Sequence, residues 1–169
     1  MDMIGYLLRL PNAELPKILE NSTLLKTITE NPESANAYKL DIHKTWEAIF
    51  FMLTGYPLAE WDSAQPPFSF VMFNLDQFVD EEQDFGFGPA NYSDPEEVHQ
   101  IAKALSVLTD ADFKKRYKSK KMLELEIYPA GFWTDSDEVF YYLKAHFDNL
   151  KKFYAEASEK NDAVIFYLS

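Results

Sequence analysis

The stretch Ala163-Val164-Ile165-Phe166-Tyr167-Leu168, close to the C-terminus, is a continuous apolar run rich in β-branched and aromatic residues. This pattern is typical of a strand that is buried on both faces of a sheet. At the other end of the chain, the segment from Ile4 to Leu10 places alternate apolar side chains on one side, which is the period of a strand. Strands from both ends of the chain are therefore predicted to lie in one sheet.

Helical patterns dominate the chain between these two strands. The longest predicted helix opens at Thr134-x-x-Asp137, and its apolar stripe is spaced 4, 3, 4 and 3 residues apart: Leu143, Phe147, Leu150, Tyr154 and Ala157. Shorter helices are predicted over 13–25, from the capping box Ser93-Asp94-Pro95-Glu96 to Leu108, from Thr109-x-x-Asp112 to Tyr117, and over 118–125. A further strand is predicted over 68–73, and an extended segment broken by glycines is predicted over 85–92.

One more helix is predicted over residues 40–53. Its apolar stripe has spacings of 4, 3 and 4 and consists of Ile42, Trp46, Ile49 and Leu53. Asp41 can cap the start of this helix, and Gly55 suits the left-handed residue just past its end. Since strands and helices do not alternate regularly, we expect an α+β fold. It forms a single domain over residues 1–169, with several helices packed on a small mixed or antiparallel sheet that includes both terminal strands.

The composition excludes several classes of protein. Apolar residues make up 47% of the 169 residues and aromatic residues 16%, which is enough for a sizeable core and argues against disorder. There is no cysteine, so disulfide scaffolds and thiolate chemistry are excluded. The sequence contains no apolar run long enough to cross a bilayer, and its start lacks the pattern of a signal peptide. We therefore expect a cytoplasmic protein that does not bind membranes.

Charge is distributed unevenly along the chain, whose net formal charge is −12. Residues 45–102 contain eleven carboxylates and no lysine or arginine, and six bases follow within the eight residues from Lys114 to Lys121. These runs either form solvated faces that neutralise each other within the fold, or form an acidic patch for a basic partner and a separate basic patch for an anion. Nucleic acid is not an expected partner, because the overall charge repels phosphates.

Common catalytic and metal-binding motifs are missing from the sequence. It has no Walker loop, dinucleotide-binding glycine motif, zinc-protease motif or nucleophile elbow. An EF-hand loop counted from Asp80 would need glycine where Phe85 stands and glutamate where Asn91 stands. No metal and no cofactor are therefore expected. His43 and Glu47, four apart on the predicted helix, form either a general base with its orienting carboxylate or a solvent-facing pair.

The segment Glu124-Leu125-Glu126-Ile127-Tyr128-Pro129 offers another candidate site. Two carboxylates and a phenol can perform acid–base chemistry when they meet in a pocket. Trp133 lies just beyond, and Trp46 could form a wall of such a pocket. In the alternative interpretation, one of the glutamates pairs with Lys120 or Lys121 and Tyr128 packs at a turn.

Several segments taken together resemble the YfbM-like family of small bacterial proteins of unknown function. They are Met3-Ile4-Gly5-Tyr6, the stretch from Leu40 to Gly55, the capped helix from Ser93, and Glu124 to Pro129. The resemblance covers nearly the whole chain and implies one α+β domain from a bacterial cytoplasm. It implies no established reaction, cofactor or catalytic residue. A site shared across the family would involve Asp41, Trp46, Thr54, Glu126 and Tyr128.

Two functions follow from these features. The first is a binding protein that engages a basic protein partner through an acidic, aromatic-rich surface, with partner-binding candidates Asp80, Glu81, Glu82 and Asp84. Bacterial immunity proteins that neutralise nuclease toxins share this acidic character, which is an analogy of charge alone. The second is an enzyme or small-ligand domain, with ligand-binding candidates Asp41, Trp46, Glu126, Tyr128 and Trp133.

Overall fold

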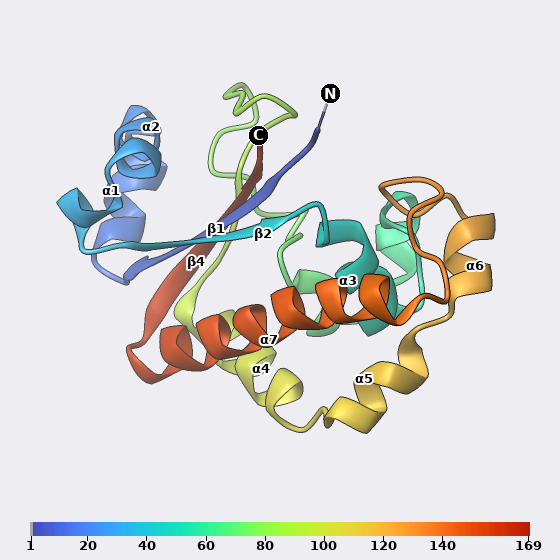
Figure 1. Ribbon diagram of the computed structural model, residues 1–169. Coiled ribbons are helices and arrows are strands. Elements are labelled where there is room, and N and C mark those ends of the chain that lie inside the picture. The colour runs from blue at the N-terminus through green and yellow to red at the C-terminus, as the bar shows by residue number, and fades with distance from the viewer. Residues whose placement is uncertain (1) are drawn as a thin grey trace.

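A computed structural model describes residues 2–169 and contains one antiparallel sheet in that range (Figure 1). Its strands are β1 (Gly5–Pro11), β2 (Tyr38–His43), β3 (Asn91–Ser93) and β4 (Asp162–Leu168), in the spatial order β2-β1-β4-β3. The predicted α+β fold is confirmed, because helices pack on a small antiparallel sheet whose two central strands come from the two ends of the chain. The first and the last strand of the chain are thus paired in the middle of the sheet.

The two central strands divide the core between the faces of the sheet. β1 and β4 pair along their full length, from Gly5 opposite Leu168 to Pro11 opposite Asp162. Leu8 and Ile165 lie on one face, and Leu7 and Phe166 lie on the other. Because β4 is buried on both faces, its side chains from Ala163 to Leu168 are apolar or aromatic rather than alternating with charged ones.

The helices cover both faces of this sheet. They are α1 (Glu14–Glu20), α2 (Thr23–Glu30), α3 (Trp46–Thr54), α4 (Pro95–Ser106), α5 (Asp110–Arg116), α6 (Ser119–Glu124) and α7 (Asp137–Glu159), with short 3-10 turns at Pro32–Ala35, Leu58–Ser63 and Phe68–Phe70. Apolar residues of α3, α4 and α7 pack on the Leu7 face, and those of α1 and α2 pack on the Leu8 face. Within residues 2–169 no helix has the length and apolarity to span a membrane.

The predicted apolar stripes of α4 and α7 are buried in the structure. The cap at Thr109 is also confirmed, since the Thr109 and Asp112 side chains each accept the other residue's backbone N–H. The capping box of α4 lies one residue later than predicted, at Asp94 and Glu97. The reason is that Ser93 pairs with Val164 in the sheet and so belongs to β3. The long helix begins at Asp137 after the cap residue Ser136.

Two sequence predictions of secondary structure are wrong, and of the extended segment predicted over 85–92 only Asn91 and Tyr92 lie in a strand, β3. Residues 40–53 form the end of β2 and then α3, so Asp41 lies in a strand and caps no helix. Ile42 mimics a helical stripe because its side chain enters the same core as Trp46 from the neighbouring strand. Residues 68–73 do not form a strand, because Met72 adopts a left-handed conformation (φ 69°) and its N–H is bound by the Tyr154 hydroxyl at 3.1 Å.

This hydrogen bond leads to a prediction for the core. Tyr154 is fully buried, so Tyr154→Phe leaves the Met72 N–H without an acceptor in an apolar environment. We expect a loss of about 1–3 kcal/mol in the free energy of unfolding, measured by urea denaturation. Tyr141→Phe, at a tyrosine that is 63% exposed, is the matched control and is expected to change stability by less than about 0.5 kcal/mol. If the two variants were equally stable, the hydrogen bond between the Met72 N–H and the Tyr154 hydroxyl would not stabilise the core.

Candidate functional site

The aromatic candidates Trp46, Tyr128 and Trp133 come together in one packed cluster. The rings of Trp46 and Tyr128 stack with centroids 4.9 Å apart. The Trp46 indole N–H donates to the Met3 carbonyl at 2.9 Å, and the Tyr128 hydroxyl accepts the Met3 N–H at 2.9 Å. The Trp133 indole N–H donates to the Tyr128 carbonyl, and Trp133 is completely buried. The polar atoms of this cluster are thus used to fix the N-terminal segment against the segment that contains Tyr128.

Glu47, in the first turn of α3, lies where this helix meets the segment that contains Tyr128, and this region is called the junction below. One of its carboxylate oxygens accepts the Tyr128 N–H at 2.8 Å, and the other accepts the Leu58 N–H at 2.9 Å. The pairing of His43 with Glu47 on one helix is therefore wrong, because His43 ends β2 and Glu47 lies in the first turn of α3. The sequence suggested either an orienting carboxylate for His43 or one member of a solvent-facing pair, whereas the Glu47 carboxylate accepts hydrogen bonds from two backbone N–H groups of other segments.

The remaining ligand-binding candidates lie outside this cluster. Asp41 is exposed on β2, and its carboxylate accepts the His43 N–H at 2.7 Å. Glu126 is exposed and has a left-handed backbone conformation (φ 53°). Over residues 2–169 no hydrogen bond links either carboxylate to Trp46, Tyr128 or Trp133.

A group of polar aromatic residues that the sequence did not reveal lies between β2 and α7. The Nδ1 atom of His43 lies 2.5 Å from the Tyr142 hydroxyl, and the rings of His43 and His146 stack at 6.2 Å. Burial, together with the neighbouring His43, lowers the pKa of His146, so this imidazole is neutral at pH 7. No local signal predicts the group, because His43 and Tyr142 are far apart in sequence and meet only through the packing of α7 on the sheet.

The partner-binding candidates all lie in one loop, residues 76–90, called the acidic loop below. Asp80 accepts the Ser22 hydroxyl at 2.6 Å and the Glu82 N–H at 3.0 Å, and these bonds hold the pKa of its carboxyl below the usual range. Asp84 accepts the N–H groups of Gly86 and Gly88 at 2.9 and 3.0 Å, which lowers its pKa likewise. Both glycines have positive φ, which explains why glycine is needed at these positions. Asp80 and Asp84 therefore organise the loop.

Glu81 and Glu82 have a different environment from these two aspartates. Both are exposed, and neither forms an ion pair within the part of the chain that the structure describes. The same loop lines an apolar pocket of about 180 Å³, whose walls include Leu58, Phe73, Leu75, Phe78, Phe87 and Leu168. The acidic loop thus combines exposed carboxylates with a small apolar pocket.

The basic run lies at the other end of the molecule, on α5 and α6 (Figure 1). Among residues 2–169, no ion pair joins the bases of residues 114–121 to a carboxylate of residues 45–102. Arg116 instead donates to the carbonyls of Met52 and Leu53, at the end of α3. This arrangement favours the interpretation of two separate patches over mutual neutralisation.

Comparison with known proteins supports the family resemblance and provides no activity. A family model described as a domain of unknown function (DUF1877) matches residues 1–167. The chain is similar to the crystal structure of a protein of unknown function, YfbM from Escherichia coli, with a TM-score of 0.73 and 20% identity over 98% of this chain and 99% of that chain. At this identity the likeness shows a shared fold. No curated protein matches the chain.

The contacts of Glu47 lead to a second prediction. Glu47→Gln keeps one oxygen acceptor but turns an amide NH₂ group toward the other backbone donor. We expect unfolding in urea to show a loss of about 1–3 kcal/mol. Glu60→Gln removes the same charge at a nearby exposed position and is expected to leave the stability unchanged. A Glu47→Gln variant as stable as the control would show that the carboxylate does not hold the junction.

Proposed function

Since the chain belongs to the DUF1877 family, a domain of unknown function, we propose from its surface that it is a protein-binding domain that engages a basic segment of a partner protein through the acidic loop. The observation that carries this proposal is that the carboxylates of the loop fall into two groups with different environments. Asp80 and Asp84 are bonded to the loop's own backbone, whereas Glu81 and Glu82 are exposed and unpaired within residues 2–169. Free charge is thus presented by a loop whose conformation is already fixed.

Preorganisation of this kind supports binding, because a loop that is ordered beforehand loses less conformational entropy when a partner docks. The loop is also fixed from outside. The Lys26 ammonium donates to the Asp84 carbonyl and lies 4.8 Å from the centre of the Phe85 ring, and the Gln83 amide donates to the Ser22 carbonyl at 2.9 Å. Contacts to α2 and to the turn before it therefore support the acidic loop along its length.

The apolar pocket beside the loop supports a protein partner over a small ligand. Its volume of about 180 Å³ is below the roughly 300–1,000 Å³ of sites that enclose drug-sized ligands, but it suits one apolar side chain. Phe87, which is 36% exposed, forms part of its rim. Binding hot spots are buried anchor residues in well-packed pockets, within interfaces whose rim is polar. The partner segment is therefore expected to carry an apolar residue among lysines or arginines.

The alternative, an enzyme or ligand-binding domain around Glu126, Tyr128, Trp133 and Trp46, has less support. Trp46 and Trp133 are buried, and the hydroxyl and carbonyl of Tyr128 already accept hydrogen bonds from the chain. Glu126 alone among these residues is exposed. A substrate could reach Trp46 and Trp133 only if the packed side chains around them moved apart.

The proposal is tested by affinity capture of a basic protein followed by titration of the purified pair. Glu81→Gln/Glu82→Gln should weaken binding at least tenfold, and the affinity of the wild type should fall steeply as salt is added, because exposed charges are screened. Glu138→Gln/Glu159→Gln removes the same charge from exposed positions on α7 and should bind like the wild type. Asp80 and Asp84 are left intact because their replacement would disturb the loop itself.

Three results would contradict this function. The first is that the wild-type protein retains no basic partner at physiological salt. The second is that the Glu81→Gln/Glu82→Gln variant binds as tightly as the wild type. The third is an affinity that does not change with salt, which would show that the acidic loop is not the binding surface.

A further inference from the structure

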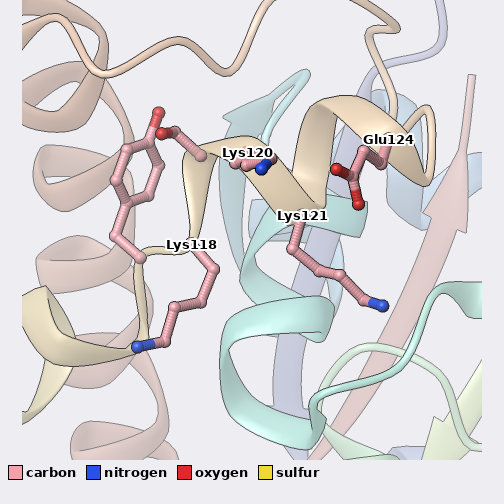
Figure 2. Close-up of a pocket in the computed structure, with 6 residues that line it drawn as sticks. Lys118, Lys120, Lys121 and Glu124 are labelled. Atoms are coloured by element: carbon pink, nitrogen blue, oxygen red, sulfur yellow. The ribbon is translucent and has the colours of Figure 1, made fainter.

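The basic run surrounds two adjoining hollows on α5 and α6, away from the acidic loop. The first hollow, of about 690 Å³, is lined by Tyr117, Lys118, Ser119, Lys120, Lys121 and Glu124 (Figure 2). The second, of about 520 Å³, is lined by Lys115, Arg116 and Lys118 together with Val107, Leu108 and Asp112. Lys118 lines both hollows, so the two form one continuous basic surface with positive charge on either side of Lys118.

The lysines of this surface have no carboxylate partner in residues 2–169. Some lysines elsewhere form ion pairs: Lys144 binds Asp110 and Asp148, and Lys44 binds Asp2. By contrast, Lys115, Lys118, Lys120 and Lys121 are exposed and form no ion pair within the described residues. Five bases and two carboxylates, Asp112 and Glu124, line the two hollows. The excess of positive charge, on a protein with a net charge of −12, forms a local field that attracts an anion.

The backbone that carries these lysines is firmly anchored. Arg116 donates to two carbonyls at the end of α3, and the Tyr117 hydroxyl donates to the Thr134 carbonyl at 2.6 Å. Met122, between the lysines and Glu124, is completely buried. The lysines therefore project from a fixed frame, and their ammonium groups can adjust to a bound anion.

We propose that this surface binds a small soluble anion that carries two or more phosphate groups. Phosphate groups suit the site because several exposed lysine point charges lie along two open hollows that share Lys118. Tyr117 is the one aromatic residue among those lining the two hollows, and its ring already contacts Phe140 in a T-shaped arrangement with centroids 5.3 Å apart. Recognition is therefore assigned to the phosphate groups, which the lysines attract and the Glu124 carboxylate repels.

The test is calorimetric titration of the protein with inorganic triphosphate at low ionic strength. We expect one saturable site, with orthophosphate binding at least tenfold more weakly. Lys118→Gln/Lys121→Gln should reduce the affinity for triphosphate at least tenfold. Lys17→Gln/Lys160→Gln removes the same charge at exposed positions on α1 and after α7, and should leave the affinity unchanged. All four substituted lysines are exposed, so both variants should fold, and circular dichroism checks this.

The opposite results would overturn the proposal. Triphosphate binding that is absent or does not saturate would show that the surface holds no anion site. An equal loss of affinity in the two double variants would show an effect of net charge alone. Citrate matches triphosphate in multiple negative charge without phosphate groups, and its binding as tightly as triphosphate would exclude a phosphate-specific site.

Discussion

The acceptance of backbone N–H groups by carboxylates is the interaction on which the middle of this structure depends. Between α3 and α4 the chain has little regular secondary structure, so its backbone donors need other acceptors. Glu47 accepts one of them, from Leu58, and also the Tyr128 N–H of a more distant segment, and Asp84 accepts two more, from Gly86 and Gly88. Glu97 accepts the Asp94 N–H and also binds the side-chain amide of Asn74. Hydrogen bonds to charged acceptors contribute about 1.5–3 kcal/mol each, more than neutral ones.

Because of these hydrogen bonds, the acidic residues of the sequence have two different roles in the structure. Many of the carboxylates between residues 45 and 102 hold the backbone, and others remain on the surface. Glu81 and Glu82 belong to the second group, at the tip of a loop that Asp80 and Asp84 keep in place. The basic residues lie on α5 and α6 at the far end, so the charge separation along the sequence becomes a separation in space (Figure 1). Two surfaces of opposite charge are thus available to different ligands.

The sequence predicted the parts of the fold that depend on local periodicity. The terminal strands, the stripes of α4 and α7 and the Thr109 cap follow from side-chain spacing alone. Long-range contacts decided the rest. Ile42 lies in a strand because its neighbours Asp41 and His43 pair with β1, and the half-buried Glu47 holds the backbone because Tyr128 approaches from a distant segment. The exposed acids could be located in the sequence, but the difference between Asp84 and Glu82 lies in hydrogen bonds that no sequence pattern reveals.

The most direct test is an NMR titration of the side-chain carboxyl groups of Asp80 and Asp84 between acidic and neutral pH. Hydrogen bonds to the ionised form lower the pKa of both groups in the folded protein. Each carboxylate therefore stabilises the fold above its unfolded pKa, and that contribution is lost as the pH falls through the lower folded value. The account predicts that both groups titrate below the ordinary aspartate range. Titration of both at the ordinary value would contradict a loop held by its own carboxylates.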